Sequence, residues 1–241
     1  MNYNAYNNIA AWYDNYLKEN PLYQEVVLPA LFKLTGDIQG QTICDLGCGQ
    51  GWITRALARR GAQMTGVDLA DQLLALADRH EAQEPLGVKY LQGDVQSDDL
   101  LPGCVFDGCV CTWSLVDIPD LSATFSTMRR LLTPGGWLVF VITHPCFEAP
   151  HAQWISMDGG GVARVVMGYF HEGFWTSEAG GVRSRVGAYH RTLSTYLNTL
   201  VAAGFVLEQM LEPAATGERG RLVAGNLEVP SLLFIRARAS I

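Results

Sequence analysis

The residues whose types and spacing most clearly indicate a binding site are an acidic side chain and three closely spaced glycines. They follow a short apolar run. They form the stretch Asp45-Leu46-Gly47-Cys48-Gly49-Gln50-Gly51, a D-x-G-x-G-x-G pattern. Glycines let the backbone turn sharply and approach a ligand closely. The dinucleotide fingerprint G-x-G-x-x-G would require glycine at position 52, where this chain has Trp52. A carboxylate ahead of the glycines instead suits a ligand that carries an ammonium group.

Short apolar runs that read as strands surround this motif, and helical patterns separate most of them. The runs cover residues 42–46, 63–68, 89–92, 106–112, 137–143, 205–212 and 231–238. Apolar side chains at helical spacing follow the glycines, as in Ile53, Ala56 and Leu57. This alternation indicates a parallel sheet with helices on both faces. Ligands bind at the carboxyl ends of such strands, where the glycine turn must lie.

Three further helices are predicted. Two precede the first strand, over residues 6–18 and 22–34, and the second is interrupted near Pro29. The third covers residues 194–203, with Ser194 as its N-cap and Gly204 just past its end.

These motifs, over about residues 40–144, resemble the class I methyltransferase family, whose members use S-adenosylmethionine. In that family the glycine-rich loop holds the methionine part of the cofactor. An acidic residue that ends the second strand binds both ribose hydroxyls, and Asp68 in Gly66-Val67-Asp68-Leu69 matches it. A carboxylate can accept two hydrogen bonds from a vicinal diol. A third motif contacts adenine, and Asp94 and Val95 in Gly93-Asp94-Val95 match it.

The resemblance implies S-adenosyl-L-methionine as the methyl donor and S-adenosyl-L-homocysteine as the product. It also implies an α/β fold, with a doubly wound, seven-stranded, mostly parallel sheet whose last strand is antiparallel. The cofactor-binding residues that we predict are Asp45, Gly47, Cys48, Gly49, Gly51, Asp68, Leu69, Asp94, Val95, Cys111 and Tyr13.

Candidate catalytic residues flank the region after the fifth predicted strand. His144 begins the stretch His144-Pro145-Cys146-Phe147. It can be interpreted as a general base or as a residue that orients the loop by hydrogen bonds. Tyr189 and His190, in Tyr189-His190-Arg191, either touch the methyl acceptor or fix the preceding segment to the sheet. A subset of small-molecule methyltransferases has a similar His-Pro-Cys-Phe stretch and a later Tyr-His-Arg. We therefore take His144, His190 and Tyr189 as the catalytic candidates.

Aromatic side chains predict the acceptor site. Residues 145–191 are rich in glycines and aromatics and lack a long helical pattern, which is typical of a functional insertion. Its aromatic rings provide flat walls for a planar acceptor, or else they cover the sheet edge or form a dimer contact. Family resemblance places an aromatic helix at the N-terminus, with Tyr6, Trp12 and Tyr13, as a lid over the cofactor. The predicted substrate-binding residues are Trp12, Trp113, Ser114, Trp154, Phe170 and Trp175.

Composition limits the kinds of partner that we expect for this protein. The chain has 241 residues and a formal net charge of −7, which opposes a nucleic-acid partner. It lacks a long apolar run and a recognisable signal peptide, so we expect no membrane span and a cytoplasmic location. Its six cysteines have no zinc-site spacing, and the sequence offers no carboxylate set of the kind that metal-assisted catechol methylation needs, so we predict no metal. Monomer and homodimer both remain open.

We therefore predict a single methyltransferase domain over residues 1–241. It comprises a helical lid (1–38), a cofactor-binding core (40–144), an acceptor-side insertion (145–191) and a C-terminal helix with strands (192–241). The predicted function is methyl transfer to an O, N or C atom of a small aromatic or heterocyclic molecule. The alternatives are a methyltransferase acting on protein or RNA, an NAD(P)-linked oxidoreductase, and a catalytically silent cofactor-binding subunit.

Overall fold

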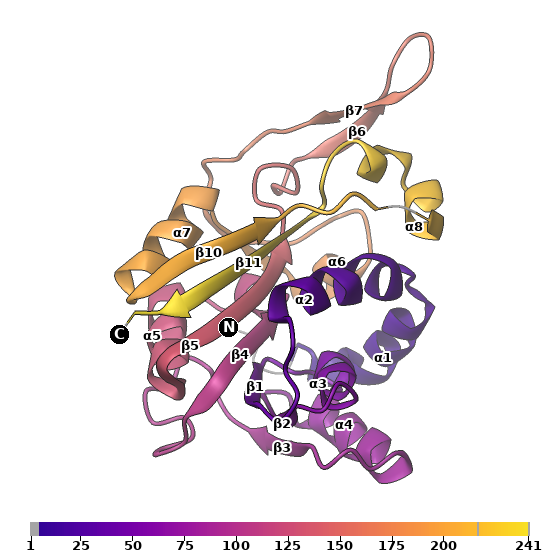
Figure 1. The fold of residues 1–241 in the computed structure, drawn as a ribbon. Helices are drawn as coiled ribbons and strands as arrows, with labels where there is room; N and C mark the ends of the chain where they lie inside the picture. The colour runs from indigo at the N-terminus through magenta and orange to yellow at the C-terminus, as the bar shows by residue number, and fades with distance from the viewer. Residues whose placement is uncertain (1–4, 216, 241) are drawn as a thin grey trace.

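A seven-stranded sheet forms the centre of the computed structural model, which describes residues 5–215 and 217–240. The strand order is β10-β11-β5-β4-β1-β2-β3 (Figure 1). All neighbours pair in parallel except β11, which is antiparallel to both β5 and β10. The predicted fold class is thus confirmed. The strands are β1 (Thr42–Leu46), β2 (Gln63–Asp68), β3 (Lys89–Gln92), β4 (Phe106–Thr112), β5 (Leu132–Thr143), β10 (Phe205–Leu211) and β11 (Leu232–Ala239).

Helices cover both faces of this sheet because alternate strand residues point to opposite sides. In β5, Leu138 and Phe140 pack in the hydrophobic cluster of α5 and α7, while Val139 and Val141 pack in that of α2 and α3. Burial on both sides explains why the strands are continuously apolar. The helices are α1 (Ala10–Glu19), α2 (Leu28–Thr35), α3 (Trp52–Ala58), α4 (Asp71–Gln83), α5 (Leu121–Leu131), α6 (Val182–Val186), α7 (Leu193–Ala202) and α8 (Gly217–Leu222).

Short helical segments complete the connections. They are η1 (Asn7–Ile9), the π-helix η2 (Tyr23–Val27), η3 (Ser114–Val116) and η4 (Ala224–Leu227). The interruption predicted near Pro29 is the change from η2 to α2, whose first turn contains Pro29 and so needs no N–H from it.

Two boundaries differ from the sequence prediction. β5 begins at Leu132 rather than near Trp137, because Leu132 already pairs with Phe106 before a register shift. Ser194 is not the N-cap of α7, since the side chain of Thr192 accepts the hydrogen bond from the Thr195 N–H. Thr192 has the extended backbone that an N-cap requires.

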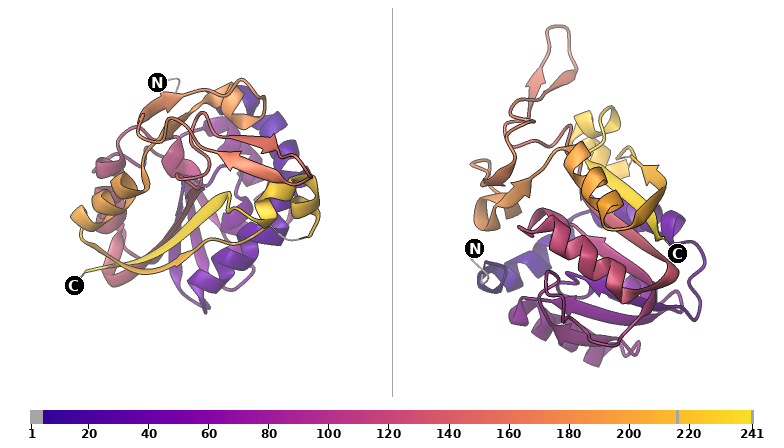
Figure 2. Two further views of the ribbon diagram at one scale, coloured as in Figure 1. Left: turned by 90° about the horizontal axis from the view of Figure 1, so that it is seen from above. Right: turned by 90° about the vertical axis from the view of Figure 1, so that its left-hand side faces the viewer.

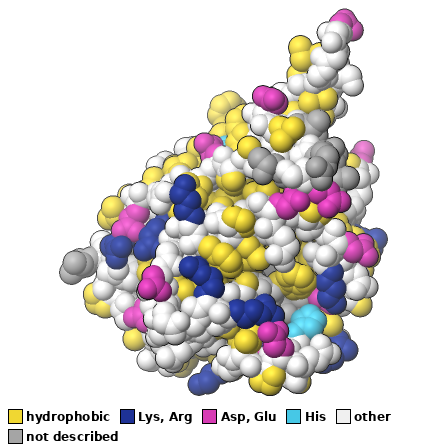
Figure 3. All heavy atoms as spheres, turned by 45° about the vertical axis from the view of Figure 1, so that its right-hand side comes forward, with side chains coloured by type: hydrophobic (Ala, Val, Ile, Leu, Met, Phe, Trp, Pro, Cys, Tyr) yellow, Lys and Arg dark blue, Asp and Glu magenta, His cyan; other side chains and the backbone are white. Residues whose placement is uncertain are grey.

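The segment between β5 and α7 folds into two hairpins and one short helix, α6. One hairpin pairs β6 (Gln153–Ser156) with β7 (Val162–Val165) and projects from the body (Figures 1 and 2). The other pairs β8 (Gly173–Trp175) with β9 (Ala188–His190). The lack of a long helix agrees with the sequence prediction. Among the described residues, no helix is long and apolar enough to span a bilayer. On the face in Figure 3, acidic and basic side chains are interspersed, and no large basic patch is visible.

Candidate functional site

The main cavity lies at the carboxyl ends of the sheet strands and has a volume of about 530 Å³. The glycine loop after β1 and the segments after β2, β3 and β4 form its floor. The N-terminal segment around α1 and η2 forms one wall, and β8, β9 and the end of α6 form another. A cavity of this size is typical of a small-molecule site.

Two of the three loop glycines, Gly47 and Gly51, lie where neighbouring side chains leave no room for a Cβ. Gly47, Gly49 and Gly51 have positive φ angles of 78°, 55° and 83°. A Cβ on Gly47 would lie 2.0 Å from the Ser114 Oγ, which donates a 2.9 Å hydrogen bond to the Gly47 carbonyl. A Cβ on Gly51 would lie 2.2 Å from the Tyr90 hydroxyl oxygen. Gly47 and Gly49 line the cavity, whereas Gly51 caps α3 behind it.

Asp68 ends β2 on the cavity wall with its carboxylate fixed by two backbone groups. The N–H groups of Gly49 and Ala70 each donate a 2.8 Å hydrogen bond, one to each carboxylate oxygen. Each oxygen of a carboxylate can accept about two hydrogen bonds, so both keep acceptor capacity. Burial raises the pKa of Asp68, and the two backbone donors oppose this effect. The arrangement suits a ligand with two adjacent hydroxyls.

Asp45 lies deeper, below the glycine loop. It is 1% exposed and accepts a 2.6 Å hydrogen bond from the Thr54 hydroxyl. Burial raises the pKa of Asp45 to about 7. A cationic group of a ligand would stabilise the ionised form of this carboxylate.

The adenine-side residues also reach the cavity. Asp94 and Val95 follow β3 and line it, as does Leu69 after β2. The Asp94 carboxylate accepts hydrogen bonds from the backbone N–H and the side-chain amide of Gln96, at 2.9 and 3.0 Å. The side chain of Asp94 is thereby held in place.

Two buried polar atoms on the cavity wall lack a hydrogen-bond partner within the described residues. They are the Gln50 amide nitrogen in the glycine loop and the Thr112 hydroxyl at the end of β4. Such groups are costly to bury unless a ligand or water pairs with them. Together with the carboxylates and the glycine cradle, they fit S-adenosylmethionine, which carries an ammonium, a carboxylate and a ribose diol.

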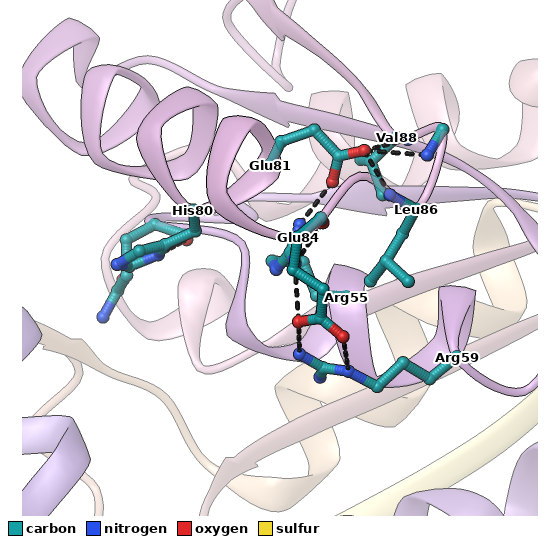
Figure 4. A network of polar contacts seen from close by, with 9 residues as sticks. Arg55, Arg59, His80, Glu81, Glu84, Leu86 and Val88 are labelled. Carbon is teal, nitrogen blue, oxygen red and sulfur yellow. Dashed lines mark hydrogen bonds and ion pairs between the residues drawn. The ribbon is translucent and has the colours of Figure 1, made fainter.

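A network of arginines and glutamates supports the helix that follows the glycine loop (Figure 4). Arg55 of α3 is buried and pairs with Glu81 and Glu84 at the end of α4. Glu81 also accepts hydrogen bonds from the backbone N–H groups of Leu86, Gly87 and Val88. This network ties α3 to α4 and to the turn before β3.

Aromatic rings form a continuous wall at another part of the cavity. The ring of Tyr23 lies 4.9 Å from that of Trp113 and 6.3 Å from that of Trp52, between centroids. Trp113 has a φ of 63°, which is rare for a bulky residue and is typical of functional sites. Trp113 was predicted here together with Ser114. Tyr23 and Trp52 were missed, because they fit the apolar spacing of ordinary packed helices.

A partly buried polar cluster lies at the cavity between the N-terminal segment and the insertion. Asp117, after η3, accepts a 3.0 Å hydrogen bond from the Tyr6 hydroxyl and pairs with Arg183 of α6. Beside it, the Arg185 guanidinium lies 4.2 Å from the Trp12 ring centroid. Sequence reasoning missed Asp117 and Arg183, which lie far apart in the chain and have no motif.

The three predicted catalytic residues do not line one common cavity. His144 is 2% exposed, and its Nε2 lies 2.6 Å from a Glu212 carboxylate oxygen while its Nδ1 accepts from the Cys146 N–H. It does not line the main cavity. His190 lines a second cavity of about 100 Å³, and its Nε2 hydrogen bonds to the Tyr169 carbonyl. Tyr189 lines both cavities.

Several predicted binding residues also lie away from the main cavity. Cys111 is buried in the sheet core, and Trp12 stacks on Tyr16. Trp154 stacks on Arg164, and Trp175 lines the second cavity. Phe170 is 83% exposed. By contrast, the predicted residues that line the main cavity are Asp45, Gly47, Cys48, Gly49, Asp68, Leu69, Asp94, Val95, Tyr13, Trp113, Ser114 and Tyr189.

Comparisons with known proteins agree on one family. A family described as "Methyltransferase domain" matches residues 44–140. The crystal structure of an S-adenosylmethionine-dependent methyltransferase from Mesorhizobium loti is 30% identical, with a TM-score of 0.73 over 87% of this chain and 96% of that chain. A glycopeptide N-methyltransferase solved with (S)-adenosyl-L-methionine has a TM-score of 0.64 at 16% identity, covering 88% of this chain and 92% of that one, and so shares the fold.

Curated relatives match over a shorter length. A ubiquinone biosynthesis O-methyltransferase from Bordetella avium is 31% identical over 133 residues, which are 54% of this chain and 55% of that protein. A second, from Alkalilimnicola ehrlichii, is 34% identical over 123 residues, 50% of this chain and 47% of that protein. The chain thus spans about half the length of the curated relatives it matches.

Proposed function

The chain belongs to the S-adenosylmethionine-dependent methyltransferases, and we propose that it transfers the methyl group of this cofactor to the hydroxyl oxygen of a small aromatic molecule. The observation that carries the proposal is the main cavity, in which carboxylates and aromatic rings line different walls. The O-methyltransferase names of the curated relatives favour oxygen over nitrogen or carbon as the acceptor atom.

Different residues of this chain would bind different parts of the cofactor. Asp68 would hold the ribose hydroxyls, and Asp94 with the Val95 N–H would hold the adenine. Asp45 and the glycine loop would hold the methionine end, with the Gln50 amide available to its carboxylate. When bound, the sulfonium of the cofactor supplies an activated methyl group. The protein then has to position the acceptor and exclude water.

The aromatic wall suits a planar acceptor. Tyr23, Trp52 and Trp113 offer ring faces, and the tilted contacts between the rings leave little freedom to each. Residues of the N-terminal segment and of the insertion line the same cavity, so the acceptor would react away from bulk water.

The predicted catalytic residues receive different proposed roles. Tyr189 lines the main cavity, and we assign it to contact with the acceptor. Both ring nitrogens of His144 have partners, and the Nε2 of His190 binds a backbone carbonyl. We therefore assign both histidines to holding the insertion against the sheet, the alternative role that their sequence positions left open.

Ligand binding tests the cofactor assignment. Isothermal titration calorimetry of the full chain should show saturable binding of S-adenosylhomocysteine and at least 100-fold weaker binding of NADH. The glycine loop lacks the third glycine of the dinucleotide fingerprint. The carboxylates that line the main cavity would also repel a pyrophosphate. Preferential NADH binding would instead support the oxidoreductase alternative.

A variant of one residue tests the proposed ribose contact within this binding assay. Asp68→Ala should weaken S-adenosylhomocysteine binding at least tenfold, because it removes the carboxylate that would hold the ribose. Unchanged affinity would disprove that role. A screen of hydroxylated aromatic metabolites, a protein extract and RNA with a radiolabelled methyl donor would then separate a small-molecule acceptor from the macromolecular alternatives.

A further inference from the structure

Asp117 is a carboxylate on a different part of the main cavity from the three assigned to the cofactor. Asp45 lies near the end of β1, Asp68 ends β2 and Asp94 follows β3. Asp117, by contrast, follows β4 and η3. In the sheet, β4 lies on the opposite side of β1 from β2 and β3. Asp117 therefore faces the lid and the insertion, where the proposed acceptor contact Tyr189 also lies.

The hydrogen bonds of Asp117 hold its carboxylate but do not saturate it. The Tyr6 hydroxyl donates to one oxygen and the Arg183 guanidinium donates to the other. Each carboxylate oxygen has two acceptor positions, so one remains on each. Burial raises the pKa of Asp117, although Arg183 and Tyr6 oppose the shift. A carboxylate with a raised pKa is a better proton acceptor near neutral pH.

The tyrosines around Asp117 are less suited to accept a proton. Burial raises the pKa of Tyr6 and Tyr23 well above the ordinary tyrosine value, and raises that of Tyr13 to about 12. These phenols stay protonated at neutral pH. His144 and His190 lie outside the main cavity. Among the described residues of its wall, Asp117 is the carboxylate on the acceptor side.

Resting on the proposed function, we propose that Asp117 is a catalytic residue that accepts the proton of the acceptor hydroxyl, with Tyr6 and Arg183 as positioning residues. The hydroxyl proton passes to the Asp117 carboxylate as the oxygen forms its bond to the methyl carbon. The carbon–sulfur bond breaks and its electron pair stays on sulfur, which leaves neutral S-adenosylhomocysteine. Asp117 then returns the proton to solvent, so the reaction releases one proton overall.

A chromophoric phenol tests this role without knowledge of the natural acceptor. 4-Nitrophenol absorbs at longer wavelength when its hydroxyl donates strongly or ionises. Titrated into the wild-type chain saturated with S-adenosylhomocysteine, it should bind with a shift to longer wavelength. Asp117→Asn, which keeps the side-chain shape, should weaken probe binding at least tenfold and remove the shift. Its S-adenosylhomocysteine affinity should stay within threefold of wild type.

A matched control removes a carboxylate that forms ion pairs with arginines away from the main cavity. Glu208→Gln, which loses the partner of Arg236 and Arg238 on β11, should retain both the affinity and the shift. The inference is overturned if wild type fails to bind the probe, or if Asp117→Asn binds it with the same shift. Failure of wild type to bind S-adenosylhomocysteine would overturn the proposed function, and this inference with it.

The positioning role of Arg183 has its own readout. Titratable and charged groups around Asp117 are Arg183, Tyr6, Tyr13, Tyr196 and Asp68, and Arg191 donates to the carbonyls of the same loop. Arg183→Gln removes a cation that lowers the pKa of Asp117, so the acidic midpoint of the probe shift should move to higher pH. A merely structural role would reduce the signal and leave the midpoint in place, which would contradict this assignment.

Discussion

At the residue scale, burial is the main influence on the charge of three carboxylates that face the main cavity. Burial is the largest influence on the pKa of Asp45, Asp68 and Asp117, and it raises all three. Local donors then decide how far each stays ionised: a hydroxyl for Asp45, backbone N–H groups for Asp68, and an arginine with a phenol for Asp117. Three similar side chains thus acquire different proposed tasks.

Asp45 gives a pH-dependent prediction. Its pKa is raised from the ordinary 3.8 to about 7, so in the free protein the carboxylate becomes protonated as the pH falls through about 7. If Asp45 holds the ligand ammonium as proposed, only its ionised form does so, and affinity should be complete above pH 7 and lost below it. Calorimetry between pH 5.5 and 7.5 should show S-adenosylhomocysteine affinity falling by up to roughly tenfold per pH unit below 7.

The control is Asp45→Asn, whose affinity should be weaker at pH 7.5 and independent of pH over this range. A wild-type affinity that stays flat from pH 5.5 to 7.5 would show that the Asp45 carboxylate does not pair with the ligand ammonium.

At the element scale, the position of the glycine loop depends on how α3 is held. Arg55 reaches from α3 to Glu81 and to both the side chain and the backbone carbonyl of Glu84 (Figure 4). Arg59 pairs with Glu84 at the surface, at 2.5 Å. The two arginines belong to one helix and share a partner, but only Arg55 is buried.

This difference predicts unequal losses of stability. Arg55→Met should lower the free energy of unfolding by about 3 kcal/mol, because it leaves Glu81 in a largely buried site without its cation. Arg59→Met should cost about 0.5 kcal/mol, as for an exposed ion pair. Urea unfolding followed by circular dichroism measures both. Equal losses in the two variants would mean that burial of Arg55 adds nothing to its contribution.

At the scale of the whole molecule, the cavity is completed by segments from distant parts of the chain. The N-terminal segment with α1 and the insertion with α6 meet above the sheet (Figure 2). Tyr6 and Arg183 share Asp117, and Arg185 stacks on Trp12. Either segment alone would leave part of the cavity open, so we expect the two to respond to a ligand together.

Hydrogen exchange tests this coupling. Saturation with S-adenosylhomocysteine should slow backbone exchange in both α1 and α6. Arg185→Ala should reduce the protection of both elements, since it removes a cation–π contact worth about 1 kcal/mol. Arg79→Ala, an exposed change on α4, serves as the control and should leave the protection unchanged. Protection confined to α1 would show that the two segments act independently.

The sequence by itself determined the family, the sheet and most of the proposed cofactor site. Those features depend on local patterns: apolar runs of strand length, glycines at positive φ, and acids at strand ends. In a parallel sheet the strand ends meet at one edge, so Asp45, Asp68 and Asp94 had to be neighbours of the cavity. Their distances apart in the chain follow from the alternation of strands and helices.

Only the tertiary structure decided which side chains meet Trp113, Ser114 and Tyr189 on the proposed acceptor side. Asp117 and Arg183 meet because the insertion folds back over the sheet, and no local pattern encodes that contact. Other long-range contacts place His144 beside Glu212 and Tyr23 against Trp113, whereas Phe170 lies in solvent. Local spacing fixes which way a side chain points from its own strand or helix. Long-range packing determines which distant segment that side chain contacts. The proposed acceptor chemistry depends on such contacts.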